Sequence, residues 1–304
     1  MLVVHSYHKT QKGHVVEMTR GIEQAFSGAK ANLHYFFMDT KRNTDPVWKK
    51  KAGILAAREM IRLKPRVVIA MDDNAQKYFV VNQMNRENSP DFVFGGVNAQ
   101  ISAYGYPRPN VTGVIERPNI QESLELLLKI RPDVKKVLMI SDKSRTMDLF
   151  VEYCKTLDLP VKVAGYVQPR TLGEWKQAVD EYKDKVDAFG IYVLRTIKEK
   201  KGSDRHVLET RLMDLLHERS GLSSVGFFDT LAASGVLCGI SVSMEEQGYA
   251  AGAMARSILE GESPDSFSIE PTRRGRIQLN LKTAERLGLP LAWKIISKAD
   301  VVIK

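Results

Sequence analysis

Features that commonly mark a membrane protein or a disulfide-stabilised protein are scarce in this chain of 304 residues. No apolar run approaches the roughly 20 residues that a helix needs to cross a bilayer. Only two cysteines occur, Cys154 and Cys238, and both have apolar neighbours. Cysteines in such surroundings are typically small buried hydrophobes. A disulfide between them stays an open alternative in an oxidising compartment, because their spacing signals none.

Signature loops of nucleotide-binding and hydrolytic enzymes are also absent. Gly95-Gly96 lacks the third glycine of a dinucleotide loop, and the chain has no Gly-Lys-Ser/Thr sequence. There is no His-Glu-x-x-His and no Gly-x-Ser-x-Gly elbow, and His5 with His8 makes a weak metal pair. The sequence therefore predicts no cofactor, no metal site and no enzyme. An enzyme on a doubly wound fold is the least favoured alternative.

An excess of acidic residues is missing too, since the formal net charge is +9. The basic residues are scattered, with small clusters at 49–51, 198–201 and 273–276. No zinc-ligand spacing or nucleic-acid motif accompanies them, so we expect no nucleic-acid partner. Nor does a signal-peptide pattern precede the strand-like start at Met1. Two alternatives remain open: a cytosolic protein, or an exported one whose targeting segment has been removed.

What the chain does have is a regular alternation of strand-like and helix-like segments. Residues 66–71 and 136–140 are continuous apolar runs, typical of strands buried on both faces of a parallel sheet. Helical spacing recurs between such runs, for example over 73–88. Alternation of this kind predicts the α/β class, with helices on both faces of a parallel sheet. Because the pattern restarts at Pro118, we predict two doubly wound lobes with a ligand cleft between them.

Polar residues follow the predicted strands in both halves of the chain. Side chains just beyond the carboxyl ends of parallel strands line the ligand crevice of an open α/β sheet. This arrangement is typical of a binding protein. The residues that we predict to contact a ligand are Ser6, Tyr7, His8, Asp72, Asn74, Asn98, Glu116, Ser141, Asp142, Ser144, Arg195 and Asp229.

Several of these positions have a purely structural alternative. Asp73, beside Asp72, could cap the helix that follows it, and the hydroxyls of Ser141 and Ser144 could cap a helix or bind an anion such as a carboxylate. Asp229 follows an apolar strand that ends in two aromatic residues. It could hold a ligand ammonium through a charge-assisted hydrogen bond, or it could be an ordinary turn residue.

Seven stretches occur in an order that resembles a known family. The chain is similar to the ABC-transporter substrate-binding proteins related to the tryptophan-binding protein TrpX, over nearly its whole length. A subtype with the Ser-Tyr-His and Met-Asp-Thr-Lys-Arg motifs also occurs as the sensing domain of signalling receptors. The matching stretches are Ser6 to His8, Tyr35 to Arg42, Asp72 to Ala75, Gly95 to Asn98, Val111 to Val114, Pro132 to Val137 and Asn280 to Leu289.

The resemblance implies a type I periplasmic-binding fold whose lobes close on a small ligand, with aromatic or other apolar amino acids bound by relatives. It also implies export, as a periplasmic protein or a cell-surface lipoprotein, and delivery of the ligand to a membrane permease. With the family's late return crossing, we expect one lobe of residues 1–116 plus 243–265 and a second of 117–242 plus 266–304. Residues 116–117 and 241–243 should absorb the closing rotation.

We therefore predict a monomeric solute-binding protein of an ABC importer, with a small zwitterionic ligand such as an aromatic or branched-chain amino acid. A ligand-sensing domain of a signalling receptor is the main alternative. Ser141, Ser144 and the amides after Asp142 should bind the ligand carboxylate, and Asp229 its ammonium. The residues expected around the ligand side chain are Ser6, Tyr7, His8 and Asn98.

Overall fold

The computed structural model describes residues 1–229 and 231–304, which form two compact units. The first unit comprises residues 1–117 and 243–274, and the second comprises 118–242 and 275–304. Residues 117 and 266–274 were expected in the second lobe, but they belong to the first unit. The late segment is held there because the Ile115 amide donates to the Glu270 carbonyl at 3.2 Å, and the Gln247 side chain donates to the Thr272 hydroxyl at 3.0 Å.

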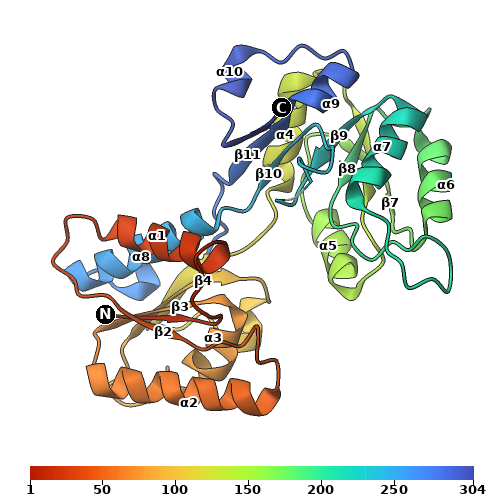
Figure 1. The fold of residues 1–304 in the computed structure, drawn as a ribbon. Coiled ribbons are helices and arrows are strands. Elements are labelled where there is room, and N and C mark those ends of the chain that lie inside the picture. The colour runs from red at the N-terminus through yellow and green to blue at the C-terminus, as the bar shows by residue number, and fades with distance from the viewer. Residues whose placement is uncertain (230) are drawn as a thin grey trace. The chain divides into compact units, whose positions relative to one another are not determined.

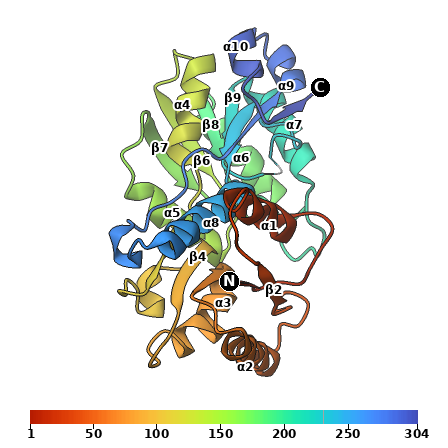
Figure 2. The same cartoon turned by 90° about the vertical axis from the view of Figure 1, so that its left-hand side faces the viewer.

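The first unit is built on a five-stranded sheet of order β2-β1-β3-β4-β5, in which every neighbouring pair is parallel (Figure 1). Helices α1 and α8 lie side by side over one face, and α2 and α3 cover the other (Figures 1 and 2). The strands are β1 (Leu2–His5), β2 (His34–Phe37), β3 (Val67–Met71), β4 (Asp91–Val97) and β5 (Val111–Ile115). The helices are α1 (His14–Ala25), α2 (Pro46–Leu63), α3 (Asp72–Tyr78), α8 (Met244–Glu260) and the 3-10 turns η1 (Val80–Asn82), η2 (Ile101–Tyr104) and η3 (Pro264–Ser266).

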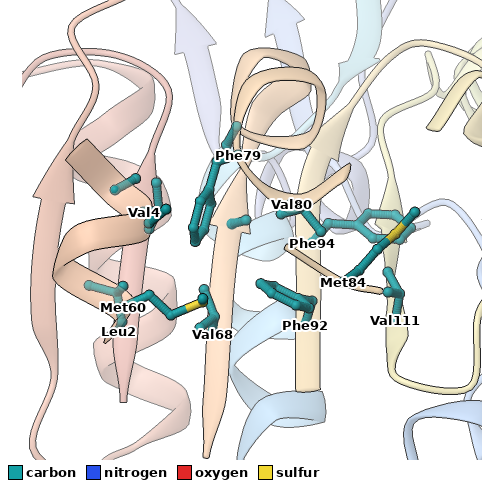
Figure 3. Close-up of a cluster of buried hydrophobic side chains, with 14 of the residues drawn as sticks. Leu2, Val4, Met60, Val68, Phe79, Val80, Met84, Phe92, Phe94 and Val111 are labelled. Carbon is teal, nitrogen blue, oxygen red and sulfur yellow. The ribbon is translucent and has the colours of Figure 1, made fainter. Parts of the chain in front are cut away.

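Alternate side chains of the central strands point into two separate layers of the first unit. Leu2 and Val4 share the α2 side of the sheet with Phe92 and Phe94 (Figure 3). His5 faces the other layer, where its ring nitrogen Nε2 lies 3.0 Å from the Thr19 hydroxyl on α1. Because both faces are covered, the central strands contain almost only apolar residues. The polar residues of this unit are therefore concentrated where the strands end.

Standard capping residues mark the starts of two long helices of this unit and the end of one of them. Asp45 accepts a hydrogen bond from the Val47 amide at 2.9 Å, and Pro46 occupies the first turn of α2. Ser243 caps α8 by accepting from the Glu246 amide at 3.2 Å, and Gly261 ends that helix in the left-handed region at φ 119°. These caps set where α2 and α8 begin and where α8 ends.

The second unit contains a seven-stranded sheet of order β12-β11-β10-β9-β8-β6-β7. All neighbouring pairs are parallel except β10 and β11, which are antiparallel. Helices α4 and α5 pack on one face and α6 and α7 on the other. The strands are β6 (Lys136–Ile140), β7 (Lys162–Val167), β8 (Ala188–Ile191), β9 (Ser223–Gly226), β10 (Cys238–Ser241), β11 (Arg276–Asn280) and β12 (Val301–Ile303). The helices are α4 (Ile120–Ile130), α5 (Arg145–Lys155), α6 (Leu172–Tyr182), α7 (Glu209–Ser220), α9 (Leu281–Arg286) and α10 (Trp293–Ile296).

The two cysteines lie in the core of this second unit. Cys154 and Cys238 are both buried and both free. Burial raises the pKa of the Cys154 thiol to about 12, so it is a protonated thiol at neutral pH. The interpretation of both residues as small hydrophobes therefore holds, and the open alternative of a disulfide does not.

Candidate functional site

The first unit gathers polar residues at one edge of its sheet. Because its five strands are parallel, their carboxyl ends share an edge, which we call the carboxyl edge of the first unit. The predicted residues reach this edge by following four different strands. They are Ser6, Tyr7 and His8 after β1, Asp72 and Asn74 after β3, Asn98 after β4, and Glu116 after β5.

Asp72 is a buried carboxyl group at this edge with an unsatisfied oxygen. Only 6% of the residue is exposed, and its Oδ2 atom has no hydrogen-bond partner. The backbone adopts a φ of 66°, which is uncommon for a residue other than glycine. Burial raises the pKa of Asp72 well above its usual value, and the charges of Glu116 and Asp73 raise it further, while Lys41 opposes the shift. Because burial and the two neighbouring acids outweigh Lys41, the protonated form of Asp72 is favoured.

Glu116 is the second perturbed carboxyl group at the same edge. Burial raises its pKa to about 7, and the charge of Asp73 adds to this effect. The shift is opposed by the Asn98 amide, which donates to Glu116 Oε2 at 3.0 Å, and by Arg117. Glu116 therefore changes charge near neutral pH.

The phenol of Tyr7 lies within the field of these acids. Its pKa is raised first by burial and then by the negative charges of Asp72, Asp73 and Glu116. Tyr7 thus stays protonated at neutral pH and offers both a donor and an acceptor. The ammonium of Lys41 lies 5.3 Å from the centre of the Tyr7 ring. Asp72, Glu116 and the Tyr7 oxygen form an environment suited to a positively charged group, and Lys41 is the cation already near them.

Two residues at this edge position the others. The Asp73 carboxylate accepts hydrogen bonds from the backbone amides of Asn98 at 3.2 Å and Ala99 at 3.1 Å, and from the Tyr104 hydroxyl at 2.7 Å. It does not cap α3, whose N-cap residue makes no side-chain bond, so the capping alternative for Asp73 is wrong. The hydroxyl of Ser6 donates to the Met71 carbonyl at 2.7 Å. The same hydroxyl accepts a hydrogen bond from the backbone amide of Ala75, in α3, at 2.8 Å.

His8 and Asn74 lie toward the loop that follows β2. The Nδ1 atom of His8 is 3.6 Å from Oδ1 of Asp39, whose carboxylate also binds Arg42 at 2.6 Å. The Asn74 amide donates to the Thr40 hydroxyl at 2.9 Å. Both predicted ligand residues therefore already have local partners on one side of the edge.

The second unit places three of its predicted residues, Ser141, Asp142 and Ser144, between β6 and α5, whereas Arg195 follows β8 and Asp229 follows β9. Asp142 is 1% exposed; its Oδ2 accepts from the Thr196 amide at 2.9 Å, while Oδ1 has no partner. The hydroxyl of Ser141 donates to the Asp142 carbonyl at 3.3 Å. Ser144 accepts from the Met147 amide at 3.4 Å and so caps α5. The capping alternative for Ser144 is thus realised, which leaves its role toward an anion as a prediction.

Asp229 is more exposed than Asp72 and has several partners of its own. Its side chain is 48% exposed, and Oδ1 accepts from the Ser241 hydroxyl and the Gln278 amide, both at 3.1 Å. The guanidinium of Arg276 is 3.8 Å away. A carboxylate with a cationic neighbour and two donors has little need of a further ammonium. Its predicted role as the ammonium-binding residue therefore competes with that of Asp72, whose Oδ2 atom has no partner.

An aromatic group of the second unit was missed at the sequence level. The rings of Phe150 and Tyr192 stack with centroids 4.0 Å apart, and Phe228 meets Tyr192 edge-on at 6.0 Å. The predicted ligand residue Arg195 has its guanidinium 4.9 Å from the centre of the Phe228 ring and 3.8 Å from the Glu209 carboxylate. The sequence did contain a signal for this group, namely a position just beyond the end of a predicted strand. Tyr192 directly follows β8, and Asp142, which was predicted on that ground, lies two residues after the end of β6.

Other classes of site find no support in the part of the chain that the structure describes. Among residues 1–229 and 231–304, no group of three or more His, Cys, Asp or Glu side chains could hold a metal ion. Within the same residues, no helix has the length and apolar character required to cross a membrane.

Comparison with known proteins identifies the family. The family model described as "ABC transporter substrate binding protein" matches residues 48–303. A tyrosine-binding protein of Clostridioides difficile is 24% identical over 188 residues, which are 60% of this chain and 51% of that protein. The chain thus matches about half the length of this relative.

Solved structures of binding proteins share the fold over almost the whole chain. The ligand-free, open structure of a substrate-binding protein with adhesive properties from Clostridium difficile has a TM-score of 0.70 at 15% identity, covering 100% of this chain and 99% of that one. The ABC domain from Streptococcus pneumonia in complex with L-Trp has a TM-score of 0.53 at 16% identity, covering 99% of each chain. The predicted two-unit α/β fold, of the periplasmic-binding type, is confirmed, and the family is one of binding proteins and not of enzymes. The chain belongs to the ABC transporter substrate-binding protein family.

Proposed function

We propose that this protein is the extracytoplasmic binding component of an ABC importer, and that its ligand is a small zwitterion such as an aromatic or branched-chain amino acid, or a similar amine. Family membership supports the transport role. The name of the relative from Clostridioides difficile specifies tyrosine, and the Streptococcus structure contains L-Trp. Delivery to a permease, attachment as a lipoprotein, a monomeric state and closure of the lobes on the ligand belong to this proposal as predictions.

The observation that carries the choice of an amine is the unsatisfied carboxyl group of Asp72. A buried polar atom without a hydrogen bond costs about 1–3 kcal/mol, and more if the group is charged. Oδ2 of Asp72 is such an atom. Evolution rarely retains this arrangement without a compensating role, and a ligand that supplies the missing donor would remove the cost.

An ammonium group matches the surroundings of Asp72 in both charge and hydrogen bonding. It carries three donors and one positive charge. Asp72 and Glu116 can accept two of those hydrogen bonds, and the Tyr7 oxygen, which lies in the field of both acids, can accept another. The positive charge would favour ionisation of both carboxyl groups, whose pKa values are raised in its absence.

This proposal moves the ammonium from Asp229 to Asp72. Asp229 already has Arg276, Ser241 and Gln278 as neighbours, whereas Oδ2 of Asp72 has no partner. The assignment of the ligand carboxylate to Ser141, Ser144 and the amides after Asp142 is unchanged and stays a prediction.

Calorimetry with a matched pair of variants tests the proposal. The wild-type chain is first titrated with each of the common amino acids, aromatic and branched-chain ones first, to find a ligand. Asp72→Asn should then weaken its binding by about 2–5 kcal/mol, because the ammonium loses a buried ionic partner. That range corresponds to roughly 30-fold to several thousand-fold in Kd. Asp229→Asn should stay within about threefold of wild type.

A folding control separates loss of binding from loss of structure. Asp72→Asn removes a buried carboxyl group without changing its shape, so thermal unfolding should be unchanged or slightly higher. If Asp72→Asn binds as wild type does while Asp229→Asn loses binding, the ammonium belongs to Asp229 and the present assignment is wrong. If no amino acid or amine binds the wild-type chain, the proposed ligand class is wrong.

A further inference from the structure

Helix α2 carries an apolar row on the side that faces away from the core of the first unit. Val47, Ile54 and Ile61 are 71%, 56% and 53% exposed, respectively. They are seven residues apart, so they lie in one line along the helix. The core-facing side of the same helix is formed by other residues, among them Ala56 and Met60. Helix α2 therefore has two apolar sides, of which only one packs against its own unit; α2 runs along the lower margin of this unit in Figure 1.

The surface is hollowed beside this row. One hollow of about 390 Å³ is lined by α2 alone, and another of about 720 Å³ lies between α2 and the segment from Lys77 to Arg86. Lys50, Ile54 and Arg58 line both hollows. A ridge with hollows at its sides is the shape into which the side-chain ridges of a second helix fit.

The charge of this surface has one sign. Its hollows are lined by Lys50, Lys51, Arg58, Lys77 and Arg86, and by no Asp or Glu. Within the described residues, neither Lys50 nor Arg58 makes an ion pair, in contrast to Arg62 on the same helix, which binds the Glu59 carboxylate at 3.0 Å. We call Val47, Lys50, Lys51, Ile54, Arg58 and Ile61 the α2 surface.

We propose that the α2 surface docks an acidic amphipathic helix of a partner protein. Leucine-like side chains of that helix would cover the row of Val47, Ile54 and Ile61, and its carboxylates would meet Lys50 and Arg58. This is the helix-in-groove mode of recognition. A second copy of the chain is disfavoured as occupant because self-pairing would place Lys50 and Arg58 against the same cations. A lipid surface is disfavoured because it offers no ridges to fill the hollows.

The probe for this proposal is a designed helical peptide of three heptads. It has Leu at the a and d positions, Glu at e and g, and a fluorescein label for anisotropy measurements with the full chain. We expect saturable binding with a Kd of about 10–100 μM at low salt, weakening as salt rises because exposed charges are screened. Ile54→Glu should weaken binding at least tenfold, since it places a carboxylate in the apolar row. Leu149→Glu is the matched control, because Leu149 is a helix residue outside the α2 surface with a similar exposure of 67%. This variant should bind the peptide as the wild-type chain does.

A charge exchange makes the test specific. The double variant Lys50→Glu, Arg58→Glu should lose the Glu peptide and bind instead the same peptide with Lys in place of Glu. Both substituted positions are on the surface, so circular dichroism should match that of wild type.

Three outcomes would overturn the proposal. The first is no saturable binding of the Glu peptide, or equal binding by Ile54→Glu. The second is that the protein does not bind the Glu peptide but co-sediments with vesicles containing phosphatidylserine, and that Ile54→Glu abolishes this co-sedimentation. That result would assign the surface to a membrane. The third is a concentration-dependent mass in sedimentation that Ile54→Glu abolishes, which would assign it to a second copy of the chain.

Discussion

Asp72 and Glu116 hold their protons more tightly in the folded chain than free carboxylic acids do. Burial raises the pKa of Glu116 from 4.5 to about 7 and raises that of Asp72 as well. Between the unfolded and folded pKa values, the folded state binds more protons than the unfolded state. The ligand-free protein should therefore be stabilised by protonated Glu116 below about pH 4.5, and should lose that contribution as the pH rises through about 7; the raised pKa of Asp72 acts in the same direction.

Glu116→Gln tests this dependence. An amide cannot ionise, so the part of the stability loss that comes from Glu116 should disappear, up to about 3 kcal/mol between pH 4.5 and 8. Urea unfolding of the ligand-free protein across that range measures the effect. Glu87→Gln, on an exposed turn, is the control and should keep the wild-type slope. A Glu116→Gln variant with the same slope as wild type would show that Glu116 is not the responsible group.

The sequence could predict where these side chains lie, but not which of them lack partners. Asp72, Asn98 and Glu116 follow three strands of one parallel sheet, so their place at the carboxyl edge follows from strand order. The partners of Asp229 come from β10 and β11, which are Ser241 and Gln278. Ser241 lies 12 residues and Gln278 49 residues further along the chain, and no local pattern pairs either with Asp229. The sequence therefore could not reveal that Asp229 is satisfied and Asp72 is not.

At the scale of elements, α1 and α8 pack so closely that their backbones touch. A Cβ atom at Gly248 would lie 2.0 Å from the Met18 carbonyl oxygen, and one at Gly21 would lie 2.0 Å from the Glu245 carbonyl oxygen. Each glycine thus makes room for the backbone of the other helix, although more than 200 residues separate the two helices in the sequence. This contact fixes the helical layer over one face of the first sheet.

Gly248→Ala should therefore destabilise the first unit. The added methyl group has no room unless α1 and α8 separate, and overpacking of this kind costs about 1–3 kcal/mol or more. Urea unfolding gives the change in the free energy of unfolding. In Gly173→Ala, on α6, the new methyl group would come no closer than 3.8 Å to its nearest neighbour, so stability should change by less than about 0.5 kcal/mol. Equal effects of the two substitutions would contradict the close packing.

The order of strands and helices was largely predictable, because their apolar periodicities differ. Two exceptions have tertiary causes. The helix predicted over 73–88 ends at Tyr78. The carbonyl of Tyr78 packs against Gly53 of α2, and a Cβ atom at Gly53 would lie only 2.0 Å from that carbonyl oxygen. Strand β11 runs antiparallel to β10 because α8, which connects the two strands, belongs to the first unit. Neither cause can be read from the local sequence.

At the scale of the whole molecule, the chain passes between the units three times, after residues 117, 242 and 274. The late segment supplies α8 to the first unit and β11 to the second sheet. Neither unit is therefore complete in any fragment that stops before the last crossing. The family resemblance implied the return, but its end at residue 274 depends on the contacts of Glu270 and Thr272 with the first unit.

A chain that ends at Val242 should consequently fail to fold cooperatively. It lacks α8, which covers β3, β4 and β5, and it exposes β10 as an edge of the second sheet. Circular dichroism during urea titration should show no sharp transition, and hydrogen exchange should be fast in both parts. The control is a chain that ends at Asp300, which loses only the edge strand β12 and should still unfold sharply. A cooperative transition for the shorter fragment would contradict the interdependence of the segments.

The discontinuity of the first unit also sets the timing of its folding during protein synthesis. Residues 118–242 are made after the five strands of the first sheet and before α8. At about 5–20 residues per second, the ribosome needs roughly 6–25 s to make them. During that interval the sheet face that α8 later covers is exposed, so the first unit has an unfinished core. The N-terminal part of the chain thus becomes native only after most of the C-terminal part has been made.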